Sequence, residues 1–295
     1  MSHAHPHSHP GHHDRPGHGP ASEDDTGLAE LLDLDAVVGA PVLATALDAA
    51  SEALGTEPRT IVDLGAGTGT GSLALAIRYQ NARIHSLDAS PAMLDRLREA
   101  AAGAGVDDRV EPHRTDLDGD WPAGLPGSLD LAWAAKSLHH VTSPTRVLQQ
   151  LMGVLRPGGV LVVIEMTGAT AFTPDDLGTG RNNLADRFAT ALAARGYPVT
   201  GEWASELAAA GFSPVMRIDT ALTASASTAV GARYLGLSLT RNRGMLGDGL
   251  AGFEGEQQLR AEDLAALDTA IADLEAGTSR LEYSSGRAIW IAVRP

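Results

Sequence analysis

The chain has 295 residues, 43% of them hydrophobic, and a formal net charge of −15 at pH 7. This length is sufficient for one large hydrophobic core with a smaller appendage. The negative charge makes nucleic acid an unlikely partner, because enzymes that act on phosphate backbones usually present a basic face. With no cysteine, the chain can form neither disulfides nor thiolate metal sites. No membrane span or secretion signal is recognisable, which predicts a cytoplasmic protein.

Residues 1–25 form a tail rich in histidine, proline and glycine, and we expect it to be disordered. Alternating imidazoles in this tail could chelate nickel, zinc or copper, the first candidates being His3, His5, His7 and His9. A solvated tail with only incidental metal affinity is the alternative. No metal is predicted in the fold itself. Residues 26–55 have a helical pattern, and Pro41 suits a first helical turn.

The most informative segment follows, with a predicted strand at residues 61–64 and a helix that contains residues 73–77. Between them stand three glycines at every second position, Gly65, Gly67 and Gly69. Glycine accepts positive φ angles and lets a ligand lie against the main chain. The spacing departs from the dinucleotide fingerprint. Asp63, two residues before the first glycine, suits a ligand with an ammonium group and would repel a pyrophosphate.

The next predicted strands end at acidic residues. Residues 83–87 form a second strand that ends at Asp88, 19 residues after Gly69, where a carboxylate can accept hydrogen bonds from both ribose hydroxyls. Residues 110–115 form a third strand, followed by Asp116. Ribose is therefore expected in the ligand, and a 2′-phosphate is not.

The pattern continues with a fourth buried strand at residues 129–133, a loop at 134–141 and an amphipathic helix at 147–155. The sequence Arg156-Pro157-Gly158-Gly159 predicts the turn that closes this helix. Residues 160–164 are apolar on both faces, as in a strand buried within a parallel sheet.

Together, Asp63-x-Gly65-x-Gly67-x-Gly69, Asp88, Asp116 and the Arg156–Gly159 turn resemble the class I S-adenosylmethionine-dependent methyltransferases, over residues 60–165. The resemblance implies an α/β, Rossmann-like fold: a seven-stranded, mostly parallel sheet with helices on both faces, an antiparallel last strand, and helical insertions forming a lid. It implies S-adenosyl-L-methionine as cofactor, held by Asp63, Gly65, Ala66, Gly67, Gly69, Asp88, Ala89, Met93, Asp116, Leu117 and Ala134.

Within that set, the family lays an apolar residue such as Met93 on the adenine face, although a place in the helix core would explain Met93 equally well. In the family, the side chain at the position of Asp116 would accept a hydrogen bond from the adenine amino group. The backbone N–H of Leu117 would donate one to the adenine ring. The family also often lays leading helices, here residues 26–55, across the cofactor.

The remaining residues of the predicted methyltransferase domain, 56–295, contain two insertions, near 167–200 and 222–286. A helix at 202–212, a strand at 214–220 and a final strand at 288–293 flank them. The insertions could form a lid over the methyl group. An arginine cluster could clamp a carboxylate or phosphate of the substrate. The substrate-binding candidates are Arg181, Arg233 and Tyr234, and ordinary surface ion pairs are the alternative for the arginines.

Three residues near the fourth strand are catalytic candidates. Lys136 is the only lysine in the chain, and it could touch a carboxylate or act as a base if burial deprotonates it. His139 and His140 could accept a proton from an attacking hydroxyl or amine. Chance placement of the lysine and a structural role for the histidine pair are the alternatives.

The sequence thus predicts a methyltransferase that moves a methyl group to an oxygen, nitrogen or carbon atom of a small molecule. One alternative is a metal-responsive binding protein that uses the histidine-rich tail. Another is a cofactor-binding homologue without methyl transfer, because the glycine motif indicates binding and not the fate of the methyl group. A homodimer is compatible with the sequence but not specified by it.

Overall fold

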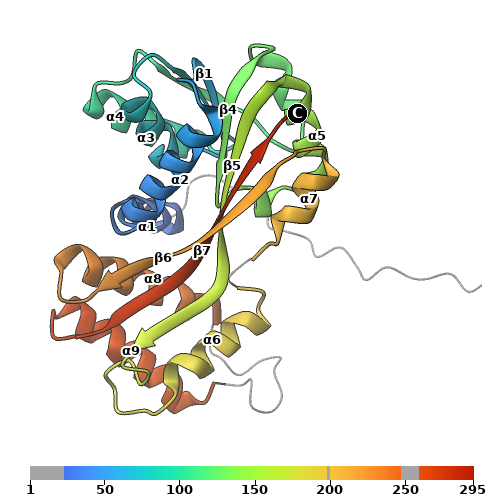
Figure 1. The fold of residues 1–295 in the computed structure, drawn as a ribbon. Helices are drawn as coiled ribbons and strands as arrows, with labels where there is room; N and C mark the ends of the chain where they lie inside the picture. The colour runs from blue at the N-terminus through green and yellow to red at the C-terminus, as the bar shows by residue number, and fades with distance from the viewer. Residues whose placement is uncertain (1–22, 198–199, 247–258) are drawn as a thin grey trace, which may run out of the picture.

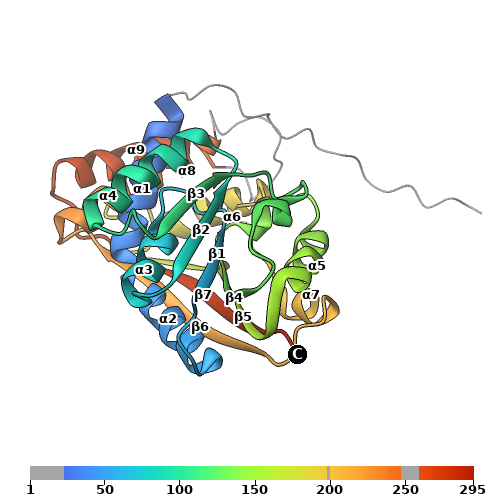
Figure 2. The same ribbon diagram turned by 90° about the horizontal axis from the view of Figure 1, so that it is seen from above.

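A computed structural model describes residues 23–197, 200–246 and 259–295, whose strands form one seven-stranded sheet in the order β3-β2-β1-β4-β5-β7-β6 (Figures 1 and 2). Strand β7 is antiparallel to both of its neighbours, and the other six strands are parallel. The predicted Rossmann-like fold is confirmed. The strands are β1 (Thr60–Leu64), β2 (Arg83–Asp88), β3 (Val110–Arg114), β4 (Leu129–Ala135), β5 (Leu155–Thr173), β6 (Val215–Ser225) and β7 (Glu282–Val293).

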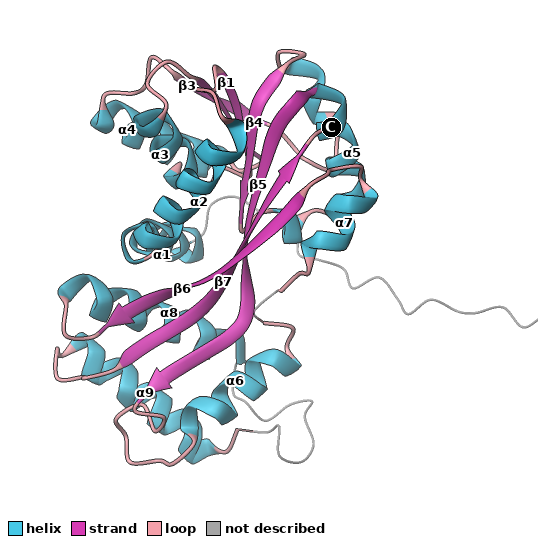
Figure 3. Cartoon of the chain, in the orientation of Figure 1, coloured by secondary structure: helices cyan, strands magenta, loops and turns pink. Residues whose placement is uncertain are grey.

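Helices cover both faces of this sheet (Figure 3). On one face lie α2 (Ala40–Leu54), α3 (Thr70–Arg78) and α4 (Pro91–Ala104), and on the other lie α5 (Pro144–Val154) and α7 (Trp203–Ala209). Successive strand residues alternate between the two resulting cores, with Ile61 in one and Val62 in the other. Burial on both faces explains why β4 and residues 160–164 of β5 are apolar at nearly every position.

Strands β5, β6 and β7 continue beyond the end of β4, and three helices pack on this extension: α6 (Leu184–Ala194), α8 (Ala229–Leu246) and α9 (Ala261–Glu275) (Figure 1). We call this part the strand extension. Its core is continuous with that of the α2–α4 face, through residues such as Phe188, Leu239 and Leu267. Helix α1 (Glu23–Val38) packs against α8 and also contacts α2 and β6.

The strand extension differs from the predicted insertions because part of them is sheet. Predicted strand 160–164 is the middle of a 19-residue strand, and β6 continues to Ser225. The predicted turn Arg156–Gly159 lies inside β5 as an irregularity, where the pairing with β4 shifts register and Gly158 has a φ of 72°. Pairing with distant strands therefore extends these elements beyond their local apolar patterns.

Helix α1 begins at Glu23, two residues before the predicted end of the tail. The tail histidines lie outside the described residues. Within the described ranges, no helix combines the length and hydropathy needed to cross a lipid bilayer.

Candidate functional site

The glycine turn connects β1 to α3 at the carboxyl edge of the sheet. Gly65, Gly67 and Gly69 have φ angles of 74°, 55° and 98°, which favour glycine. The N–H groups of Gly65 and Ala66 both donate to the Leu87 carbonyl, at 2.8 Å. A Cβ atom on Gly65 would lie 2.5 Å from the Ser137 side chain. The turn is thus held between β2 and the loop after β4, with no room for a side chain at Gly65.

Asp63 lies behind this turn and is only 2% exposed. Its Oδ2 accepts a hydrogen bond from the Ser72 hydroxyl at 2.7 Å, and Ser72 Oγ lies 2.7 Å from Ser86 Oγ. Burial raises the pKa of Asp63 to about 7. The carboxyl group therefore joins β1 to the start of α3, and its charge changes near neutral pH.

Asp88 brings the end of β2 to the glycine turn. Its Oδ2 accepts from the Gly67 N–H and its Oδ1 from the Ser90 N–H, both at 2.8 Å. Each carboxylate oxygen keeps a lone pair for another donor. Ala89 follows Asp88, and half-buried Met93 stands in the first turn of α4, where its N–H donates to the Ser90 hydroxyl at 3.4 Å. Asp88, Ala89 and Met93 thus continue the carboxyl edge of the sheet from the glycine turn to the start of α4.

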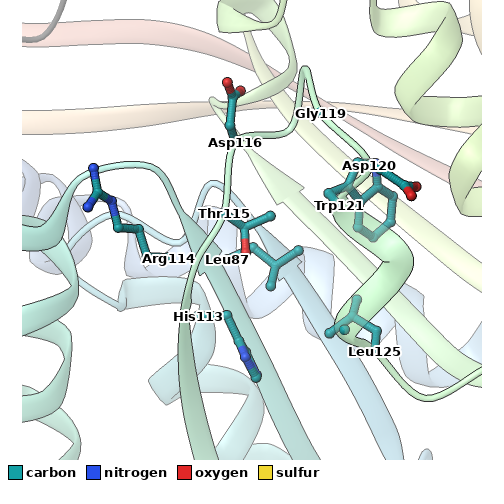
Figure 4. A pocket seen from close by; sticks show the side chains of 10 residues that line it. Leu87, His113, Arg114, Thr115, Asp116, Gly119, Asp120, Trp121 and Leu125 are labelled. Atoms are coloured by element: carbon teal, nitrogen blue, oxygen red, sulfur yellow. The ribbon is translucent and has the colours of Figure 1, made fainter.

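Asp116 follows β3 and lines a cavity of about 380 Å³ together with Leu87 and Trp121 (Figure 4). Its Oδ1 accepts from the Asp118 N–H at 2.9 Å. Leu117 is buried beside it. Ala134 is completely buried within β4.

Bare turn backbone, a carboxylate with spare acceptor capacity and an adjacent cavity fit a cofactor that contains a nucleoside.

Helix α1 covers this edge. Leu32 lies 3.9 Å from the Cβ position of Gly67, and Asp33 pairs with Arg96 of α4 at 3.5 Å. Nearer the start of α1, Glu30 forms a bidentate ion pair with Arg233 of α8, at 2.7 and 2.8 Å. The helix therefore connects the glycine turn to the strand extension.

A second group of polar residues meets at Asp35 of α1. Asp35 forms an ion pair with Lys136, accepts from the Tyr234 hydroxyl at 3.3 Å, and lies 3.8 Å from an Arg287 nitrogen. Burial opposes ionisation of Asp35, but Lys136, Arg287 and the Tyr234 hydroxyl together outweigh it, so the pKa of Asp35 lies below its ordinary value. Lys136 has a φ of 55°, a strained conformation for a residue with a side chain.

His139 follows in the same loop, within a short 3-10 helix (η2, Leu138–His140). Its Nδ1 lies 2.7 Å from Oε2 of Glu165, and the two side chains are 8% and 1% exposed. The other Glu165 oxygen has no hydrogen-bond partner among the described residues. The ring of His140 lies 4.0 Å from that of His139. If the Nδ1–H donates to Glu165, Nε2 of His139 is left as a proton acceptor.

The three substrate candidates are not brought together. Arg181 pairs with Asp263 and, at 3.6 Å, with Glu262, and Arg233 pairs with Glu30. Both arginines thus make the ion pairs that the sequence analysis kept as the alternative. Only Tyr234 joins the Asp35 group.

Sequence reasoning missed Asp35, Glu165 and Arg287. Each lies in a helix or strand with no local motif, and only the tertiary structure brings them near Lys136 and His139.

A family model described as "Methyltransferase domain" matches residues 61–159. A malonyl-[acyl-carrier protein] O-methyltransferase of Laribacter hongkongensis is 32% identical over 123 residues, which cover 41% of this chain and 40% of that protein. A demethylmenaquinone methyltransferase of Clavibacter sepedonicus is 39% identical over 110 residues, covering 36% and 41%. The match therefore spans about two fifths of these relatives.

One solved structure supports the fold over a longer part of the chain. It is that of a candidate methyltransferase from Bacillus halodurans C-125, which has a TM-score of 0.51 and 14% identity. The similarity covers 85% of this chain and 99% of that one. At this identity, the likeness concerns the fold alone.

Proposed function

We propose that this chain, whose residues 61–159 match a methyltransferase domain, is a class I S-adenosylmethionine-dependent methyltransferase that moves a methyl group from S-adenosylmethionine to an oxygen, nitrogen or carbon atom of a small molecule. One observation carries the proposal: Asp88 bonds to the Gly67 N–H at the carboxyl edge of the sheet, and α1 covers the same turn. Ligands of open α/β sheets bind at that edge.

The residues at this edge have distinct binding roles in the proposal. Asp88 would accept hydrogen bonds from the ribose hydroxyls, and the turn backbone would lie against the cofactor. Asp116 would accept a hydrogen bond from the adenine amino group, and Met93 would cover the adenine face. S-adenosylmethionine, when bound, supplies a methyl group already activated by its sulfonium. The chain therefore has to position the acceptor and exclude water. Helix α1 serves both purposes, because it spans from the glycine turn to α8.

An acceptor that begins as a hydroxyl or a protonatable amine must lose a proton on methylation. In the proposal Nε2 of His139 takes that proton, and buried Glu165 orients the ring and stabilises the resulting imidazolium. A carbon acceptor, or a nitrogen acceptor that has no proton to lose, needs no base. With such an acceptor, His139 would only hold the loop in place.

The group around Asp35 suggests what kind of acceptor binds. Lys136 and Arg287 carry two positive charges against the single carboxylate of Asp35. The loop that contains Lys136 also touches the glycine turn, through Ser137. Surplus positive charge beside the cofactor edge favours an acceptor with an anionic group, such as a carboxylate.

Cofactor binding is tested by calorimetry with S-adenosylmethionine and its demethylated product. Asp88→Ala removes two hydrogen bonds to a charged group and should weaken binding by about 100-fold or more. Asp95→Ala, on the exposed side of α4, is the matched control and should bind as the unmodified chain does. Equal affinity in Asp88→Ala, or no binding by the unmodified chain, would contradict the proposal.

Transfer is tested with a methyl-labelled donor and a panel of small acceptors, read by mass spectrometry. The panel should contain matched pairs with and without a carboxylate. We expect labelled product, and faster transfer to the anionic member of a pair. Faster transfer to the neutral members would contradict the acceptor class while leaving methyl transfer supported.

A further inference from the structure

Three potential metal ligands lie together at the edge of the sheet, on the face opposite α3 and α4. His85 is on β2, and Glu111 and His113 are on the edge strand β3. In the parallel pairing His85 stands opposite Glu111, and Leu87 stands opposite His113. Because side chains alternate along a strand, all three point to one face. Strand pairing thus brings together residues that are 26 and 28 positions apart.

The distances between their ligand atoms match a tetrahedral metal site. His85 Nδ1 lies 3.2 Å from both His113 Nε2 and Glu111 Oε2, and the last two atoms are 3.9 Å apart. Tetrahedral zinc with ligand bonds of 2.0–2.1 Å separates its ligand atoms by about 3.3 Å. One cation placed between these three atoms would contact all of them at once.

The surroundings prepare these residues for a cation. Arg83 donates to Oε1 of Glu111, which orients the carboxylate and leaves Oε2 toward the histidines. The His85 side chain is only 6% exposed. Its Nε2 is buried with no hydrogen-bond partner among the described residues.

We propose that His85, Glu111 and His113 bind one divalent transition-metal ion, with zinc as the fitting example, independently of the methyl-donor site. Two imidazoles and one carboxylate are a donor set that zinc accepts. The side chains of Glu111 and His113 are 34% and 35% exposed, which gives the ion a route in and leaves a fourth position for water. Sequence reasoning placed no metal in the fold, because these residues form no motif along the chain.

The ion would link the edge strand β3 to β2, because its ligands come from both strands. His113 also lines the cavity that contains Asp116, so the ion would stand at the wall of that cavity (Figure 4). The cluster is the only group of three or more histidine or acidic side chains with converging ligand atoms in the described part of the chain.

The test must separate this site from the histidine-rich tail, which can itself bind metal. The full-length chain is therefore prepared with the seven histidines from His3 to His18 replaced by asparagine. Zinc is titrated against a chromophoric chelator, and cobalt(II) is followed by its visible absorption, which is strong for four ligands and weak for six. We expect one bound ion, a strong cobalt band and a rise in Tm with zinc.

Variants of the proposed metal ligands are then made in the same full-length chain with the tail histidines replaced. His113→Asn and Glu111→Gln, both at partly exposed positions, should weaken zinc binding by at least 10–100-fold, the cost of losing even an outer-shell partner. They should also lose the cobalt band and the rise in Tm. Glu99→Gln, exposed on α4, is the control and should keep all three signals.

Thermal unfolding without metal checks that each variant is folded. Absence of a bound ion in the chain without tail histidines, or unchanged zinc affinity in both ligand variants, would overturn the proposal. Neither result depends on S-adenosylmethionine, so the proposed methyl transfer is judged separately.

Discussion

The glycine-turn edge and the strand extension are built in different ways. The edge is made of short strands, each followed closely by a turn or helix, and its residues lie within a continuous part of the sequence, from β1 to β4. In the strand extension, Thr170 of β5 pairs with Ser285 of β7, and Ser225 of β6 pairs with Glu282. The first region is encoded locally, whereas the second depends on contacts between distant residues. The proposed donor site lies in the first, and the proposed acceptor site lies where the two meet.

The largest effect is expected from a side chain in the glycine turn. Gly65→Ala forces a positive φ on alanine and places its Cβ 2.5 Å from Ser137, so measurable binding of S-adenosylmethionine should be lost in calorimetry. Gly55→Ala is the matched control, because Gly55 has a φ of 63° and nothing lies within 4 Å of its Cβ position. That control should lose only about 1 kcal/mol of stability and keep its affinity. Normal affinity in Gly65→Ala would contradict the placement of the cofactor.

His139→Gln should reduce turnover by about 100-fold with an acceptor that must lose a proton, because glutamine cannot accept one. The pH dependence of kcat/KM should lose one limb in this variant. With an acceptor that has no proton to lose, turnover should change little. A variant that keeps both its rate and its pH profile with a hydroxyl acceptor would show that His139 only supports the loop.

Lys136→Met removes the main partner of Asp35 and one charge of the proposed acceptor site. We expect kcat/KM for an anionic acceptor to fall by about 10–100-fold, the value of one hydrogen bond to a charged group. The Kd of S-adenosylmethionine should stay the same, which would separate the two regions. Lys136→Arg keeps the charge and should recover part of the loss. A methionine variant as active as the unmodified chain would remove Lys136 from the acceptor site.

The smallest effect is a change in how stability depends on pH. The pKa of Asp63 rises from 3.8 to about 7 on folding, so the folded chain binds a proton that the unfolded chain has released. Its contribution to the free energy of unfolding is therefore favourable at low pH and is lost as the pH rises toward 7. Asp63→Asn cannot ionise but can still accept from Ser72. Its stability relative to the unmodified chain should increase across this window in urea titrations.

Asp130→Asn provides the contrast for this measurement. Burial opposes ionisation of Asp130, but Arg156 and the hydrogen bonds from the Arg59 and Thr60 N–H groups together outweigh it and lower the pKa. This variant should instead become less stable than the unmodified chain as the pH rises through the acidic range. Parallel pH curves for the two variants would contradict the assigned environments.

Much of the fold could be predicted because its signals are local. The β-branched and apolar residues at 61, 62 and 64, the glycines after them and the proline at position 91 each identify an element within a few residues. The same holds for Asp88, whose place at a strand end predicted its position at the edge. The lengths of β5 and β6 could not be predicted, since they depend on pairing with β7.

By itself, the sequence determined the order of strands and helices, the glycine turn and the acidic residues beside it, because these follow from φ preferences and apolar periodicity along the chain. Only the tertiary structure decided which polar side chains meet. It joined Lys136 to Asp35, His139 to Glu165, and His85 to Glu111 and His113. Partners across a sheet or between helices leave no trace in local spacing, because they depend on how distant parts of the chain pack together.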